Sequence, residues 1–183
     1  TFDRSTVDGT ATVADNDYFG VPPTGSTINA GTTMANFLVS VINDSKVEAN
    51  ETFMMTLNAL LSSGRNVTFS GGGATLSGTG TIINDDSAVI TLSGTQSLTE
   101  GNTGNTPFTF NATLNNPVQG GFMVAYTTND GTATLANNDY TDNDGTLTFA
   151  GTAGEIETIT VQGIGDFNIE PDETFTVVLG TVT

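Results

Sequence analysis

The sequence predicts an all-β protein that consists of two successive antiparallel β-sandwiches. Three observations support this: apolar residues alternate with period two, turn residues separate the alternating segments, and one long phrase occurs twice. Alternation buries one side of a strand and leaves the other in water. Gly, Asn-Asn-Pro and Asp-Gly turns between the segments favour antiparallel sheets over β-α-β units. The alternating segments are Phe37–Val41, Phe53–Leu57, Phe108–Leu114, Phe122–Tyr126 and Phe175–Leu179.

The repeated phrase indicates an internal duplication. Residues 7–18 and 129–140 agree at nine of twelve positions, with an offset of 130 − 8 = 122. The same offset aligns residues 42–53 with 164–175, where Ile, Asp, Glu, Glu, Thr and Phe are identical. Two separate windows in one register predict a duplicated structural unit, and not a recurring low-complexity phrase.

The boundary between the two predicted units lies at two consecutive aspartates. A strand is expected to end at Ile83, Asp85 and Asp86 follow, and a new strand is expected to start near Ala88. The predicted domains are therefore residues 1–86 and 87–183. Since only one or two residues can serve as a linker, we expect the units to abut at a defined angle.

Charge and composition exclude several classes of function. Three basic residues stand against 20 acidic ones, and the net charge is −17, so nucleic acid and anionic lipid are not expected partners, whereas cations are. No apolar run approaches the roughly 18 residues of a membrane-spanning helix, so no membrane insertion is expected in this segment. There is no Cys or His, which removes disulfides and the usual zinc ligands.

Several segments resemble successive stretches of a Calx-beta domain. This family is the immunoglobulin-like Greek-key module of sodium-calcium exchangers, some integrin cytoplasmic regions and many large bacterial surface proteins. The resemblance implies two tandem immunoglobulin-like Greek-key β-sandwiches and covers nearly the whole chain. The segments that carry it are SLTEGNTGNTPFTFNATLNNP (97–117), DGTATLANNDY (130–140), GTLTF (145–149), EPDETF (170–175) and GTIINDD (80–86).

Against the family pattern, both units are expected to be incomplete at the chain ends. Residues 1–86 lack the first strands, and residues 87–183 lack the last strand. An incomplete sheet exposes unpaired backbone and apolar side chains. Two explanations remain open: the chain is a window from a longer tandem array, or neighbouring copies donate the missing strands. The expected partners are accordingly adjacent repeats of the same protein and, in the second case, other copies of the chain.

Acidic residues recur at equivalent positions of the two repeats, at strand ends or in the adjoining loops. They are Asp17, Asp44, Glu48 and Glu51 in the first repeat, and Asp139, Asp166, Glu170 and Glu173 in the second. The resemblance implies that loops at one end of each sandwich gather these residues with an early-loop acid, Glu100, and with the closing aspartates Asp85 and Asp86. The first repeat is expected to lack the segment that would supply its early-loop acid, and the second to lack its closing aspartates, so each site is expected to be incomplete in this sequence.

Calcium is the cofactor that this chemistry favours. Converging carboxylates repel one another unless a cation lies between them. Oxygen ligands on flexible loops suit the six to eight positions of Ca²⁺ better than the tight octahedron of Mg²⁺, and softer metals are disfavoured without Cys or His. The resemblance also implies Ca²⁺. The alternative interpretation is that the acidic loops are the solvated surface of a spacer.

Two further motifs have simpler interpretations. The pairs Asp8-Gly9 and Asp130-Gly131 predict tight turns in which glycine takes a positive φ. Tyr18 and Tyr140 are interpreted as packing anchors at loop corners. An enzyme would have to rely on carboxylates alone, such as Glu170 and Glu173 as a glycosidase pair, but these lie three residues apart in an acidic turn, so no catalysis is expected.

The sequence therefore predicts a calcium-binding structural or adhesive repeat of an extracellular or cell-surface protein. Calcium at the loop ends and unit junctions would stabilise the folded state and stiffen the array. Asp17, Asp44, Glu48, Glu51, Asp85 and Asp86 would surround the first ion. Two alternatives are a calcium-sensing regulatory domain of a transporter and a strand-exchanging subunit of an extracellular filament.

Overall fold

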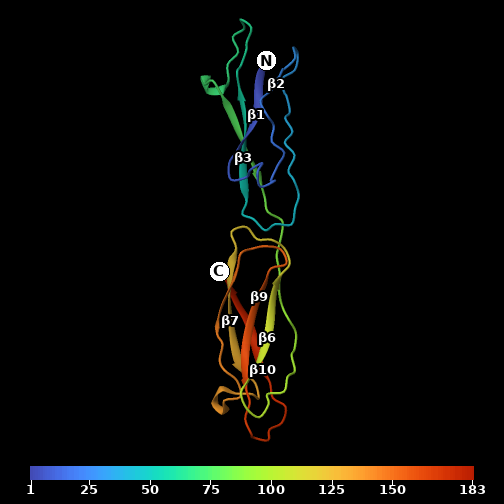
Figure 1. The fold of residues 1–183 in the computed structure, drawn as a ribbon. Coiled ribbons are helices and arrows are strands. Elements are labelled where there is room, and N and C mark those ends of the chain that lie inside the picture. The colour runs from blue at the N-terminus through green and yellow to red at the C-terminus, as the bar shows by residue number, and fades with distance from the viewer. The chain divides into compact units, whose positions relative to one another are not determined.

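The computed structural model describes residues 1–183 and contains ten β-strands and two short 3-10 helices (Figure 1). The predicted all-β class is confirmed. The chain divides into two compact units. The first unit comprises Thr1–Asp44 and Glu48–Asp85, and the second comprises Ser45–Val47 and Asp86–Thr183. Neither helix has the length and apolar character that a membrane-crossing helix requires.

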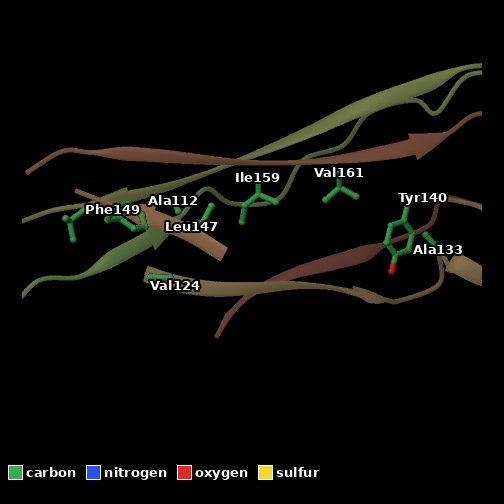
Figure 2. Packing of buried hydrophobic residues seen from close by; sticks show 9 residues of the cluster. Ala112, Val124, Ala133, Tyr140, Leu147, Phe149, Ile159 and Val161 are labelled. Carbon is green, nitrogen blue, oxygen red and sulfur yellow. The ribbon is translucent and has the colours of Figure 1, made fainter. Parts of the chain in front are cut away.

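The second unit is a sandwich of two three-stranded antiparallel sheets, with strand orders β10-β7-β8 and β5-β6-β9. Its strands are β5 (Ile90–Leu92), β6 (Asn105–Leu114), β7 (Phe122–Asp130), β8 (Gly145–Phe149), β9 (Ile156–Ile164) and β10 (Phe175–Val182). Leu114 of β6 and Ile159 and Val161 of β9 are buried with Val124 of β7 and Phe149 of β8. The core therefore lies between the sheets (Figure 2), as the period-two alternation predicts.

The first unit contains one four-stranded antiparallel sheet with the order β2-β1-β3-β4. Its strands are β1 (Phe2–Asp8), β2 (Thr24–Ser26), β3 (Glu51–Asn58) and β4 (Leu76–Ile82). A 3-10 helix, η1 (Ser70–Gly72), lies between β3 and β4. Strand β3 pairs with β1 on one side and with β4 on the other. Its counterpart β10 pairs only with β7 and is an edge strand.

One predicted strand of the first unit is wrong. Phe37 and Val39 are half-buried between exposed neighbours, but Val41 is exposed, and residues 37–41 form no strand apart from a single bridge between Tyr18 and Val41. Their counterpart in the second unit, at an offset of 122, lies within β9, which pairs with β6 over nine residues. No strand of the first unit pairs with residues 37–41 as β6 pairs with β9. Without a ladder, an alternating sequence stays extended but isolated.

The repeated phrase folds into the same corner in both units, which we call the Asp-Tyr corner (residues 8–18 and 130–140). In each corner the tyrosine hydroxyl donates to the aspartate Oδ1, at 2.5 Å in the first and 2.7 Å in the second. The ring of Tyr18 stacks on Phe53 and that of Tyr140 on Phe175. The interpretation of the tyrosines as corner anchors is confirmed, and the hydroxyl adds a hydrogen bond to the packing.

The predicted reason for the Asp-Gly pairs is wrong. Gly9 and Gly131 do not have a positive φ; Asn16 and Asn138 carry the left-handed conformation of each corner instead. A Cβ on Gly131 would lie 2.3 Å from the carbonyl oxygen of Thr174. A Cβ on Gly9 would lie at the same distance from the carbonyl oxygen of Thr52. These glycines are therefore needed because the backbones approach closely, and not because of a dihedral angle.

Candidate metal centre

Five carboxylates converge in the second unit, and we call them the second-unit cluster. They form two groups of three, and within each group one oxygen from every residue lies within 4.8 Å of the others. Glu170 belongs to both groups, so the five side chains form one continuous set. The groups are Glu100, Asp166, Glu170 and Asp139, Glu170, Glu173. All five residues were candidates from the sequence.

Four stretches of chain supply these acids. Asp139 ends the Asp-Tyr corner, where its Oδ2 accepts the backbone N–H of Thr134 at 2.7 Å. Asp166 follows β9, and its Oδ1 accepts the N–H of Asn168 at 2.6 Å. Glu100 lies in the loop between β5 and β6, while Glu170 and Glu173 precede β10. Turn bonds therefore hold Asp139 in the Asp-Tyr corner and Asp166 just after β9.

Desolvation and then mutual repulsion raise the pKa values of the two glutamates that precede β10. Partial burial raises the pKa of Glu170, and the charges of Asp166, Asp139 and Glu100 raise it further. The pKa of Glu173 is raised by partial burial and then by the charges of Asp139 and Glu170. A hydrogen bond to Asp139 adds to this rise. Such a site favours either a proton or a cation between its carboxylates.

The first unit has a smaller group, which we call the first-unit cluster: Asp15, Asp17 and Glu48, again with one oxygen of each within 4.8 Å of the others. Asp17 and Glu48 were predicted, and Asp15 was missed. Asp15 does not recur in the second repeat, where its counterpart is Asn137. Its position two residues before Asp17, within the same turn, could have identified it.

Four predicted ligands lie outside these groups: Asp44, Glu51, Asp85 and Asp86. Asp44 corresponds to Asp166, which in the second unit forms a group with Glu100 and Glu170. Glu51 is the first residue of β3 and pairs with Ile82 of β4, whereas its counterpart precedes β10. Asp85 and Asp86 follow β4 and join no group.

The same five acids line a cleft of the second unit. Its wall also includes the aromatic rings of Phe108, Phe110 and Phe175. Apolar walls lower the local dielectric and strengthen the interaction of the carboxylates with any cation that enters. The arrangement is suited to binding a hard divalent cation through oxygen atoms.

The family model of the Calx-beta domain matches the chain twice, over residues 1–86 and 84–183. The chain belongs to the Calx-beta family. The resemblance inferred from the sequence is thereby confirmed. Calx-beta is not a family of catalytic domains, in agreement with the expectation that the chain is not an enzyme. No curated protein sequence matches the chain at a significant level.

Two solved structures similar to this Calx-beta tandem are described as the calcium binding domain CBD12 of CALX1.1 and CBD12 from CALX1.2. The first is 21% identical with a TM-score of 0.39, and the second is 24% identical with a TM-score of 0.43. Each alignment covers 99% of this chain. The chain spans 66% of the first structure's length and 67% of the second.

Proposed function

We propose that the chain binds Ca²⁺ through the carboxylates at the loop ends of its two Calx-beta units. The observation that carries this proposal is the convergence of five acids in the second unit, with atoms of each group within 4.8 Å. The raised pKa values of Glu170 and Glu173 support it, because desolvation and neighbouring negative charges both disfavour their ionised forms, which a bound cation would favour. Membership of the Calx-beta family agrees with the same ion.

The donor set favours calcium over other ions. All the clustered ligands are carboxylate oxygens, and they come from several loops that can adjust to a large coordination number. Magnesium would require a tighter octahedron. Transition metals prefer nitrogen or sulfur ligands, and the chain has no Cys or His.

The biological role that fits best is a calcium-dependent structural or adhesive repeat of an extracellular or cell-surface protein. The net charge of −17 and the abundance of Gly, Thr and Asn support this role. In such a protein, calcium that binds only the folded state stabilises each unit by mass action. The expected partners are adjacent repeats of the same protein, whose array calcium would stiffen.

Two other roles use the same fold. A calcium sensor in a transporter would bind with a Kd of about 10⁻⁷ to 10⁻⁵ M, whereas extracellular modules bind at about 10⁻⁴ to 10⁻³ M. Strand exchange between copies of the chain is the second alternative. Light scattering across a concentration series would reveal such association.

Calorimetric titration with calcium tests the proposal. Glu170→Gln removes the residue shared by both groups and should weaken second-unit binding on the order of tenfold or more, since ligand charge sets affinity. Asp172→Asn is the matched control, because it removes the same charge from an exposed residue of the same loop outside the cluster. If wild-type protein binds no calcium at millimolar concentration, only a passive spacer remains.

A further inference from the structure

The two clusters do not draw on equivalent residues. Asp17 and Glu48 of the first unit correspond to Asp139 and Glu170 of the second, at an offset of 122. The third member of the first-unit cluster is Asp15, whose counterpart Asn137 carries no charge. The first unit therefore has an acid at a position where the second unit has none.

A buried oxygen in the same cluster indicates that something binds there. Asp17 is only 6% exposed, and its Oδ2 accepts the N–H of Thr12 at 2.6 Å. Its Oδ1 is buried and has no hydrogen-bond partner. Buried polar atoms without a partner are rare in native folds because they forgo the hydration that they had in water.

The turn that carries Asp15 has a fixed shape. The N–H of Asp15 donates to the Thr12 hydroxyl at 3.1 Å, and that of Asp17 donates to the Thr12 carbonyl at 3.2 Å. Between them, Asn16 has a φ of 67°. The turn therefore presents two carboxylates on one side, within 4.8 Å of Glu48.

We propose that Asp15 is a metal ligand particular to the first unit, completing a Ca²⁺ site with Asp17 and Glu48. This inference rests on the proposed function. The third carboxylate of this site comes from its own corner. Water or backbone oxygen would fill the remaining calcium positions. With three carboxylates against five, the first site should be the weaker.

Asp15→Asn tests the proposal without disturbing the turn. The second unit already has Asn at this position, and the N–H of Asn137 donates to Thr134 at 3.2 Å, as that of Asp15 does to Thr12. The variant is therefore expected to fold. Asp3→Asn, on β1 and outside the cluster, is the matched control for the loss of one negative charge in the first unit.

Calcium titration followed by amide NMR reads the two sites separately. The amides of Thr12 and Asp17 report the first site, because one of them donates to the Asp17 carboxylate, and those of Thr134 and Asp139 report the second. In Asp15→Asn, the calcium concentration at the midpoint of the response of the Thr12 and Asp17 amides should rise about tenfold, since lost ligand charge weakens binding. The midpoint of the second pair should not change, and Asp3→Asn should leave both unchanged.

The other possible results separate a failure of this inference from a failure of the proposed function. If the first pair responds equally in wild type and Asp15→Asn, Asp15 is not a ligand, while a response of the second pair keeps the proposed function. If the midpoints of both pairs rise together, the effect is a change in overall charge, and the proposal is wrong. If neither pair responds to millimolar calcium in the wild type, both the proposed function and this inference fail.

Discussion

The hydroxyl of Tyr140 should stabilise the second unit through a single hydrogen bond that can be removed cleanly. Tyr140 is 2% exposed, and its hydroxyl donates to Asp130 Oδ1 at 2.7 Å. Its ring stacks on Phe175 with centroids 4.8 Å apart. Tyr140→Phe keeps this stacking and removes only the donor. A hydrogen bond to a charged group contributes about 1.5–3 kcal/mol to stability, so the free energy of unfolding should fall by that amount.

Urea unfolding followed by circular dichroism measures the loss. Tyr126→Phe is the matched control, because Tyr126 is only half-buried and donates to a neutral acceptor, Asn143 Oδ1, at 3.2 Å. A neutral bond contributes about 0.5–1.5 kcal/mol. If Tyr140→Phe costs no more than Tyr126→Phe, the assignment of a charge-assisted bond to the corner is refuted.

Alkaline pH probes the same bond from the other direction. Burial raises the pKa of Tyr140 above its usual value of 10, and the bond to Asp130 and the nearby aspartate charges raise it further. A raised folded-state pKa means that the stabilisation is fully present below pH 10 and is lost as pH rises through the folded-state value. Tyr140→Phe should therefore flatten the alkaline part of the curve of stability against pH.

Three further predictions concern a glycine, the cluster and a loop. Gly131→Ala should destabilise the second unit by about 1–3 kcal/mol through overpacking, measured by urea unfolding, whereas Gly94→Ala, with open space around it, should change stability by less than about 0.5 kcal/mol. As the pH is lowered, calcium affinity measured by calorimetry should begin to fall while the pH is still above 4.5, the usual glutamate pKa, because protons compete with calcium at Glu170 and Glu173. An affinity that stays constant down to pH 4.5 would contradict this. Backbone N–H donors lower the pKa of Glu155, so its stabilisation is present above pH 4.5 and lost on acidification through the lowered value, and Glu155→Gln should remove this dependence.

The sequence predicted those features that depend on local pattern or on the repeat. Period-two alternation identified the buried faces of β6, β7 and β10, because side chains of a strand alternate whatever its partners are. The repeat also identified four of the five acids of the second-unit cluster, since each has an acidic counterpart 122 positions earlier, and the family resemblance identified the fifth, Glu100. These predictions required no knowledge of which strands pair.

The sequence could not predict features that depend on partners far along the chain. Residues 37–41 have a strand's pattern, but only a neighbouring strand turns this pattern into a ladder. The need for glycine at position 131 comes from a backbone 43 residues later, at Thr174. Asp15 was missed for a different reason: the comparison of repeats selects what two units share, and this residue is where they differ.

The repeated phrase can be understood as a frame that presents one carboxylate at a fixed place. Asp130 accepts the tyrosine hydroxyl, Gly131 allows the chains to approach, and the N–H of Thr134 binds the carboxylate of Asp139. The remaining acids come from loops whose mutual repulsion raises glutamate pKa values. A carboxylate that is already held in place lowers the entropic cost of binding a cation. The repulsion between the carboxylates of the loops is relieved when a cation binds between them. Since the frame recurs in the first unit with Asp17, each unit keeps this carboxylate while the acids around it differ, as Asp15 in the turn of the first corner illustrates.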